Sequence, residues 1–183
     1  MGQVQRGAQA RRGRHAGVFL ACLLGMALHA QAETLTGRAV GVSDGDTFTN
    51  LDFTNTQHKI RLAGIDAPEK SQPFGQRSKE SLSELVFGRT VTVETDKVDR
   101  YRRKVGKVMT PEGIDANLEQ VRRGLAWHYK EYEQEQSEAD RATYAAAEEI
   151  ARGQRRGLWG DAQQVPPWEF RKAQRTRPLI EQS

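Results

Sequence analysis

Three acidic side chains and one arginine lie in two short segments whose composition suits chemistry on an anion. The first segment is Asp44-Gly45-Asp46-Thr47, and the second runs from Arg61 through Asp66 to Glu69. Carboxylate oxygens are preferred ligands of a hard cation such as Ca²⁺, and an arginine fork matches the oxygens of a phosphate. If Asp46, Asp66 and Glu69 converge, they describe a cation site beside a place for an anionic substrate.

Two strands are expected to bring these segments together. Residues 47–51 and 59–65 have the apolar and β-branched character of strands, and the polar stretch between them favours a turn. A hairpin that placed Asp46 opposite Asp66 would turn about Thr56. The sequence thus predicts that acids far apart in the chain meet at one end of a β-ribbon.

The second strand must be irregular if Arg61 and Asp66 are to work together. Arg61 and Asp66 are an odd step apart in the sequence, so on a regular strand their side chains would point to opposite faces. A bend at Gly64 would re-aim one of them at little cost. Pro68 would then fix the backbone direction toward Glu69.

The first 32 residues have the three-part composition of a secretory signal. Arginines without any acid come first, an apolar run over residues 16–28 follows, and Ala30-Gln31-Ala32 places small residues where a signal peptidase cuts. We expect cleavage after Ala32 and a periplasmic or secreted product. The apolar run is short for a membrane span, which makes a retained anchor the less favoured alternative.

Loss of this segment would change the charge balance. The chain has 28 Lys and Arg against 24 Asp and Glu, and four of the arginines lie in the first 15 residues. The mature chain would carry 24 of each and be formally neutral. Net charge therefore gives no argument for nucleic-acid binding; only local basic clusters could. Cys22, the single cysteine, lies in the signal, so no disulfide or thiol chemistry is expected in the mature protein.

The remaining elements are those of a small barrel with helices. Alternation predicts strands at 34–42, 90–94 and 104–109, and helical spacing predicts helices at 76–87, 115–124 and 137–153. Five strands and three helices favour the α+β class, with a five-stranded Greek-key barrel of the OB type over residues 33–160.

The chain after the second helix carries three further predictions. In the long helix, the recurring small residues Ala139, Ala142 and Ala146, with Ile150, predict the buried stripe. Leu158-Trp159 is expected to pack back onto the core. Residues 161–183 are expected to form a short polar tail that docks in part through Trp168 and Phe170.

The acidic segments belong to a longer set of short motifs. The set also includes Asp99-Arg100-Tyr101-Arg102-Arg103, Gly124-Leu125-Ala126 and Leu158-Trp159. In this order and spacing, the motifs resemble those of the thermonuclease, or staphylococcal-nuclease-like, family. The resemblance covers roughly residues 34–160. Each piece alone is weak, since Asp-Gly-Asp is a common turn, but the set is specific.

The resemblance implies an OB-fold barrel with three helices and calcium-dependent hydrolysis of phosphodiesters in DNA and RNA. Asp46 and Asp66 correspond to the carboxylates that hold one calcium ion, and Ala67 to a residue that ligates through its backbone carbonyl. Glu69 corresponds to the proposed general base. The residues that correspond to the phosphate-binding arginines are Arg61 and Arg103.

The loop at 99–103 departs from the family pattern. The family usually has Gly where this chain has Arg102, and Gly adopts positive φ without the steric cost that Arg bears. The placement of Arg103 is therefore open, and Arg102 could share its role. Asp99 is expected to order this loop rather than to bind metal. The tyrosines that could contact the substrate are Tyr101, Tyr129 and Tyr132.

These features predict an exported monomer that acts on DNA and RNA, with no stable protein partner and no membrane anchor after cleavage. Two alternatives from other classes stay open. One is a non-catalytic OB-fold nucleic-acid-binding module of the same superfamily, and the other is a metal-binding envelope protein unrelated to nucleic acids. The first would be expected to lose the acids, which this chain retains at Asp46, Asp66 and Glu69.

Overall fold

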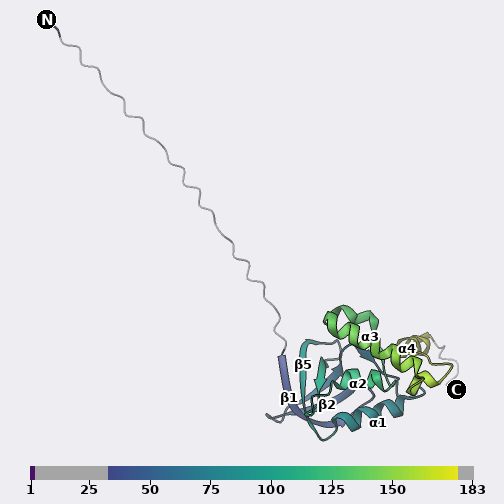
Figure 1. The fold of residues 1–183 in the computed structure, drawn as a ribbon. Coiled ribbons are helices and arrows are strands. Elements are labelled where there is room, and N and C mark those ends of the chain that lie inside the picture. The colour runs from purple at the N-terminus through teal and green to yellow at the C-terminus, as the bar shows by residue number, and fades with distance from the viewer. Residues whose placement is uncertain (3–32, 177–183) are drawn as a thin grey trace.

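A closed barrel of five strands lies at the centre of the structure, with helices along its sides (Figure 1). The computed structural model describes residues 1–2 and 33–176, so the predicted signal peptide lies almost wholly outside the described residues. In chain order the elements are β1 (Glu33–Val42), β2 (Thr47–Asp52), β3 (Gln57–Leu62), β4 (Ile65–Asp66), α1 (Gly75–Val86), β5 (Thr90–Val98), β6 (Lys104–Met109), α2 (Ala116–Arg122), β7 (Trp127–His128), η1 (Lys130–Glu135), α3 (Glu138–Gly153), η2 (Gly157–Gly160) and α4 (Pro167–Thr176).

The barrel closes in the order β1-β2-β3-β6-β5. Its neighbours are antiparallel except β3 and β6, which run parallel. Phe48, Ile60 and Val93 point inward and are fully buried, as alternation along a strand requires. The predicted α+β architecture, a five-stranded barrel with helices, is confirmed, and it is consistent with the OB-fold.

The predicted register of the β2–β3 hairpin is wrong. Thr47 pairs with Arg61, and the Leu62 amide donates to the Asp46 carbonyl at 2.8 Å, so Asp46 faces Leu62 rather than Asp66. The turn begins two residues earlier than the prediction requires, because the Asp52 side chain caps it by accepting from the amides of Thr54 and Thr56.

The bend expected at Gly64 is present and splits the predicted strand in two. Gly64 has φ +70°, β3 ends before it, and β4 begins after it. β4 leaves the barrel and pairs antiparallel with β7, which places Asp66 opposite Trp127. Asp66 therefore reaches the end of the barrel from a separate two-stranded sheet, and not as the hairpin partner of Asp46.

The helices begin as predicted, but one of them buries a different face. The Asp115 side chain accepts from the Leu118 amide to cap α2, and Ser137 caps α3 through the Asp140 amide. The buried positions of α3 include Tyr144 and Ala151, whereas the predicted stripe Ala139, Ala142, Ala146 and Ile150 is exposed. That prediction is wrong because Tyr144 is larger than the alanines and its hydroxyl is held by Asp115 at 2.9 Å.

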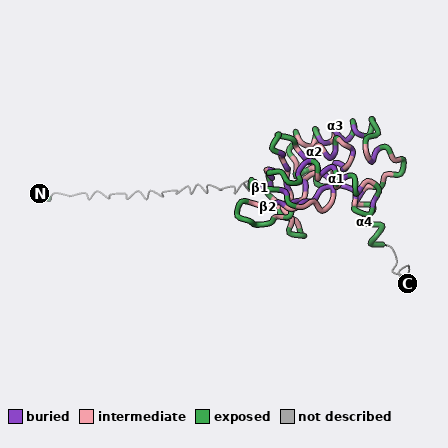
Figure 2. The backbone as a smooth tube through the Cα atoms, turned by 90° about the horizontal axis from the view of Figure 1, so that it is seen from below, coloured by how far each residue is buried: buried purple, intermediate pink, exposed green. Residues whose placement is uncertain are grey.

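The stretch predicted as a tail contains a fourth α-helix, α4, so the expected count of three helices is one too low. Trp168 packs against an aromatic cluster that includes Trp127 and Trp159, and Leu158-Trp159 is buried as expected. Most of α4 is intermediate or exposed, in contrast to the barrel and the helices that cover it (Figure 2). Among the described residues, no helix has the length and hydropathy needed to cross a lipid bilayer.

Candidate active site

A cleft of about 710 Å³ opens where the ends of β2, β3 and β4 meet the loop after β5, η1 and α4. Every residue that the sequence analysis proposed for the site lines this cleft, with the exception of Arg102. The proposed residues at the cleft are Asp46, Arg61, Asp66, Ala67, Glu69, Tyr101, Arg103, Tyr129 and Tyr132. The fold therefore collects in one place residues that the chain spreads over four segments.

Arg61 joins the two proposed metal carboxylates. Its Nη1 lies 3.1 Å from Asp46 Oδ2, and its Nη2 lies 2.9 Å from Asp66 Oδ1. The guanidinium also donates to the Ile65 carbonyl at 2.9 Å, across the bend at Gly64. The Asp66 side chain is 1% exposed. The bend thus lets Arg61 reach Asp66, which on a regular strand would have pointed to the opposite face.

The loop Asp44-Gly45-Asp46 is held by hydrogen bonds and close packing against neighbouring elements. Asp46 Oδ2 accepts from the Ala67 amide at 2.8 Å, and Asp46 Oδ1 accepts from the Thr47 hydroxyl at 2.9 Å. At Gly45, a Cβ would lie 1.8 Å from Ser78 Oγ, so only glycine allows α1 to approach this closely. The Gly45 carbonyl accepts from Gln120 Nε2 at 2.7 Å. Asp46 is therefore positioned by contacts from β4, α1 and α2.

Burial makes these carboxylates costly to ionise without a cation. Desolvation raises the pKa of Asp66, and the charge of Arg61 opposes this rise. Desolvation, with the neighbouring charge of Asp46, raises the pKa of Asp44 to about 6. An added cation would stabilise the ionised forms of both groups. The ionised forms of Asp44 and Asp66 would therefore be stabilised by positive charge in the cleft.

The loop that carries Arg103 is ordered by Asp99, as expected. Asp99 Oδ1 accepts from the amides of Tyr101 and Arg103, both at 2.9 Å, and Asp99 Oδ2 accepts from Arg103 Nε at 2.8 Å. Arg103 Nη1 also donates to the Thr47 hydroxyl at 3.2 Å, beside Asp46. Arg102 has φ +63°, the conformation for which glycine would be favoured, and its side chain lies outside the cleft.

Aromatic side chains form part of the wall of the cleft. The Tyr129 ring stacks on Trp168 with centroids 5.3 Å apart and contacts Tyr132 edge-on at 5.2 Å. Lys97 lies over the Tyr132 ring at 5.0 Å. The sequence left open which tyrosine reaches the site; in the structure both line the cleft.

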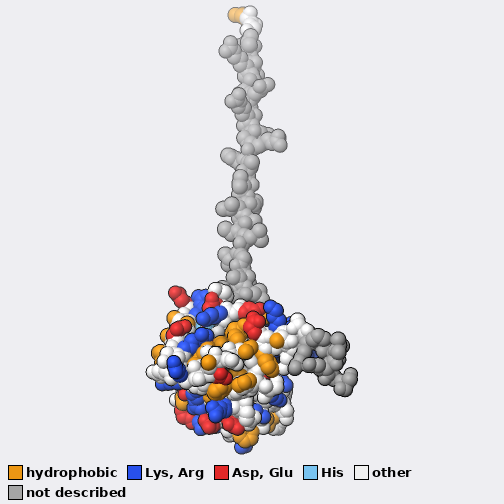
Figure 3. All heavy atoms as spheres, turned by 90° about the vertical axis from the view of Figure 1, so that its right-hand side faces the viewer, with side chains coloured by type: hydrophobic (Ala, Val, Ile, Leu, Met, Phe, Trp, Pro, Cys, Tyr) orange, Lys and Arg blue, Asp and Glu red, His pale blue; other side chains and the backbone are white. Residues whose placement is uncertain are grey.

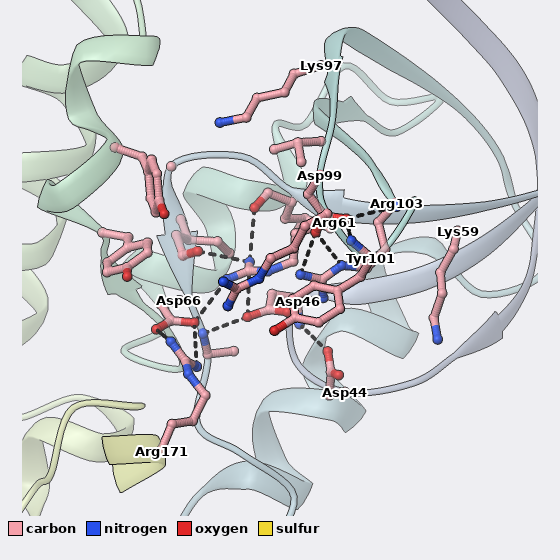
Figure 4. Close-up of a pocket in the computed structure, with 18 of the residues that line it drawn as sticks. Asp44, Asp46, Lys59, Arg61, Asp66, Lys97, Asp99, Tyr101, Arg103 and Arg171 are labelled. Carbon is pink, nitrogen blue, oxygen red and sulfur yellow. Dashed lines mark hydrogen bonds and ion pairs between the residues drawn. The ribbon is translucent and has the colours of Figure 1, made fainter. Parts of the chain in front are cut away.

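Sequence reasoning missed one residue at the centre of the site. Arg171, from α4, donates to Asp66 Oδ2 at 2.9 Å through Nη2 (Figure 4). It also donates to Glu69 Oε1 at 2.8 Å through Nη1. Desolvation would lower the pKa of Arg171, but its hydrogen bonds to Asp66 and Glu69 outweigh that effect and raise the pKa. A signal was present in the sequence, since Pro167 followed by a run of good helix formers is typical of a helix start.

The donor set suits a hard cation. Two buried carboxylates converge, and a third acid, Glu69, lines the same cleft. Within the described part of the chain, no group of three or more His, Cys, Asp or Glu side chains is arranged to hold a metal ion. A cation at Asp46 and Asp66 would thus take its remaining ligands from backbone carbonyls and water, which Ca²⁺ accepts readily. The Ala67 amide lies at the site; the ligand role of its carbonyl stays a prediction.

Comparison with known proteins identifies the family. A sequence model of the family described as "Staphylococcal nuclease homologue" matches residues 59–161. The chain belongs to the staphylococcal nuclease family. It is 43% identical over 135 residues to a protein of Escherichia coli O157:H7 named "Uncharacterized endonuclease", which covers 74% of this chain and 84% of the relative.

Two further family members show similar likeness over most of their length. A Haemophilus influenzae protein, also named "Uncharacterized endonuclease", is 41% identical over 143 residues, covering 78% of this chain and 76% of the relative. A "Micrococcal nuclease" of Shigella flexneri is 38% identical over 145 residues, covering 75% of this chain and 80% of the relative. The likeness to these members of the staphylococcal nuclease family thus extends over most of each chain rather than over a local motif.

Charge on the described surface is mixed rather than uniformly basic. Lys and Arg side chains lie among Asp, Glu and apolar ones on the face that Figure 3 shows. The cleft is mixed as well. Its lining has seven basic side chains, Lys59, Arg61, Lys97, Arg100, Arg103, Arg171 and Arg175, and six acidic ones, Asp44, Asp46, Asp66, Glu69, Asp99 and Glu135.

Proposed function

We propose that this protein is an exported, calcium-dependent nuclease that hydrolyses phosphodiester bonds in DNA and RNA with little preference for the sugar. The observation that carries the proposal is the Arg61 bridge between Asp46 and Asp66 at the floor of a cleft lined by further arginines and tyrosines. Membership of the staphylococcal nuclease family and the nuclease names of its relatives support the same reaction class.

The arginines are proposed to stabilise the charge that develops on the phosphate. Attack by water on a phosphodiester increases the negative charge on its equatorial oxygens, and fixed positive groups stabilise it. Arg61 and Arg103 both reach the Asp46–Thr47 corner, so their guanidinium groups can approach one phosphate from two sides. Calcium held by Asp46 and Asp66 would add Lewis-acid charge at the same corner.

Glu69 is proposed to accept the proton of the attacking water. Its side chain is 38% exposed, so water can reach it, whereas Asp46 and Asp66 are buried beneath it. In this conformation Glu69 Oε1 accepts from Arg171, which occupies one of the two carboxylate oxygens. Departure of Arg171 would leave both oxygens free to accept from water.

The groups proposed to hold the polymer explain low sugar specificity. Guanidinium groups bind phosphates, and the rings of Tyr129, Tyr132 and Tyr101 offer faces on which any base can stack. Discrimination of RNA from DNA needs contacts with the 2′-hydroxyl, and the proposed set assigns none. Both polymers are therefore expected as substrates.

Digestion of both polymers tests the proposal. Purified protein is incubated with single-stranded DNA or RNA in Ca²⁺, in EDTA, and in EDTA followed by excess Ca²⁺, and Asp46→Ala serves as the matched control. We expect cleavage of both polymers that EDTA abolishes and Ca²⁺ restores, and little cleavage by Asp46→Ala. Binding of oligonucleotides without any shortening over hours would instead favour the non-catalytic OB-fold module.

Export and a monomeric state are part of the proposal and need their own measurements. The composition of the first 32 residues supports export. N-terminal sequencing of protein recovered from the periplasm or medium should begin at Glu33. Light scattering of the same material should give the mass of one chain.

A further inference from the structure

Arg171 lies where a cation bound to Asp66 would have to approach. Asp66 Oδ2 accepts from Arg171 Nη2 at 2.9 Å, and Asp66 Oδ1 lies 3.3 Å from Arg171 Nη1 and 2.9 Å from Arg61 Nη2. Both carboxylate oxygens are thus engaged by guanidinium groups. Figure 4 shows Asp66 between the two arginines, with Arg171 reaching in from α4.

The two arginines are held in different ways. Arg61 belongs to β3, its side chain is 13% exposed, and it also donates to two backbone carbonyls. Arg171 is 34% exposed, and its described polar contacts are with Asp66 and Glu69 alone. Rotation of its side chain into the open cleft would break only these contacts. Arg171 is therefore the partner that can leave Asp66.

The anchorage of α4 does not depend on that contact. Trp168 stacks on Tyr129 and packs edge-on against Trp127, and Pro167 is buried. The carbonyl of Val165, just before the helix, accepts from Gln72 Nε2 at 3.0 Å. The helix can therefore stay docked while the Arg171 guanidinium moves. The docked helix keeps the guanidinium close enough to pair with Asp66 again.

We propose that Arg171 is a built-in competitor of calcium at Asp66, and that it sets the calcium concentration at which the site fills. The inference rests on the proposed function in one respect, namely that Asp66 is a calcium ligand. When calcium is scarce, the guanidinium pairs with both oxygens of Asp66 and with Oε1 of Glu69. When calcium binds, Asp66 changes partner and Glu69 is released to the cleft.

The competition has a simple quantitative form. If the paired conformation of Arg171 outweighs the unpaired one by about ten to one, the apparent calcium dissociation constant rises about elevenfold, because only the unpaired fraction binds. A ratio of this size is reasonable for charge-assisted hydrogen bonds to a buried carboxylate, which are among the stronger contacts in proteins. Removal of the guanidinium should therefore strengthen calcium binding by about tenfold.

Calorimetric titration with CaCl₂ in the absence of nucleic acid tests the inference. The proteins are wild type, Arg171→Ala, Arg171→Lys and Arg175→Ala. Arg175 lies on the same helix, lines the same cleft, and forms no ion pair among the described residues, so it controls for loss of one positive charge nearby. We expect about tenfold tighter calcium binding in Arg171→Ala, a smaller gain in Arg171→Lys, and a change of less than about twofold in Arg175→Ala.

Thermal unfolding gives a second measurement on the same variants. In EDTA, Arg171→Ala should unfold at a lower temperature than wild type, because Asp66 loses a partner that spans both of its oxygens. Saturating calcium should then raise the midpoint of Arg171→Ala by more than that of wild type. If Arg171→Ala does not fold, Arg171→Lys carries the test, since it retains the charge without the fork.

Several results would overturn the inference. Calcium binding by Arg171→Ala that is equal to or weaker than wild type would show that Arg171 does not compete. An equal gain in calcium affinity in Arg175→Ala would show that the effect comes from any positive charge on α4 and not from the contact of Arg171 with Asp66. Calcium binding by none of the proteins would remove the site itself.

The inference and the proposed function fail in different ways. If the protein cleaves DNA but Arg171→Ala leaves calcium affinity unchanged, the proposed role of Arg171 is wrong and the proposed nuclease function stands. If calcium binding tightens as expected but no polymer is cut, the role of Arg171 stands and the nuclease function is wrong.

Discussion

Gln120 offers the sharpest test of how the fold positions the acids. It is fully buried in α2, and its Nε2 donates to the carbonyls of Gly45 at 2.7 Å and Ser78 at 2.9 Å. Its Oε1 accepts from the Ser81 hydroxyl at 2.6 Å. A single amide therefore ties α1 and α2 to the loop that carries Asp46.

Replacement of Gln120 by Leu leaves a side chain of similar size but removes these three hydrogen bonds and a longer one of 3.4 Å from Nε2 to Ser78 Oγ. Ser78 lies inside α1, where its carbonyl also takes part in the helix, so the groups left without a partner are the Gly45 carbonyl and, in part, the Ser81 hydroxyl. A buried polar group without a partner costs about 1–3 kcal/mol, so we expect a loss of about 2–4 kcal/mol in the free energy of unfolding. Small domains are stable by about 5–15 kcal/mol, so the variant should still fold.

Urea unfolding and calcium titration measure the two consequences. We expect Gln120→Leu to lose stability and also to bind calcium several-fold more weakly, because the loop that carries Asp46 loses its hydrogen bond at the Gly45 carbonyl. Ser81→Ala is the matched control: it removes the bond to Oε1, keeps the bond to Gly45, and should cost about 1 kcal/mol with unchanged calcium affinity. Equal stability of the two variants, or equal loss of calcium affinity, would refute the reasoning.

Three further predictions follow from the site. Glu69→Gln should reduce cleavage by about a hundredfold or more while calcium affinity stays within a few-fold of wild type; wild-type turnover would exclude Glu69 as the base. Gly45→Ala places a methyl group 1.8 Å from Ser78 Oγ and should cost about 1–3 kcal/mol in urea unfolding, and an unchanged midpoint would contradict the close packing. Asp99→Asn tests a pH dependence. Despite desolvation, the hydrogen bonds from Arg103 hold the pKa of Asp99 below its ordinary 3.8. The ionised carboxylate therefore stabilises the folded state above pH 3.8, and this contribution is lost as the pH falls through the lowered pKa. Stability of wild type and Asp99→Asn measured from pH 7 to pH 2 should therefore converge at the acidic end, and a constant difference would show that Asp99 stabilises by other means.

The sequence was sufficient to predict the five strands of the barrel, the helices α1 to α3 and the acids that line the cleft; β7 was not predicted. Each of these leaves a local trace. Leu82, Leu85 and Val86 repeat at helical spacing and are buried on α1, and Asp115 is a helix cap by residue type. The bend at Gly64 followed from parity alone, since Arg61 and Asp66 could not otherwise share a site. Such features depend on neighbours within a few residues.

The register of the hairpin was wrong although a local signal was present. The turn has Asn55 at φ +63°, and Asp52 accepts from Thr54 and pairs with His58. Asp and Asn favour turns of this kind, so Asp52 marks where β2 ends. The prediction instead assumed that Asp46 and Asp66 must face each other, and it fitted the turn to that assumption.

The role of α4 could not be predicted because it depends on distant contacts. Arg171 meets Asp66 and Glu69 across more than a hundred residues of chain, and no local pattern specifies which arginine of a basic segment will reach a buried acid. The face of α3 was missed for a related reason. Its alanines have the better spacing, but the partner of Tyr144 is Asp115 on another helix.

Charge balance accounts for the pairing of Asp46, Asp66 and Glu69 with arginines. Asp46, Asp66 and Glu69 carry three negative charges in or beside a buried corner, and Arg61 and Arg171 supply two positive ones, which leaves one net negative charge. A calcium ion in place of Arg171 would bring the cluster to zero, so exchange of one cation for the other improves the balance while Arg61 stays fixed. Removal of Arg61 would instead leave two buried carboxylates without their permanent partner, at a cost of several kcal/mol. The two arginines should therefore differ in kind: loss of Arg61 weakens the fold and the site together, whereas loss of Arg171 exposes the site to calcium.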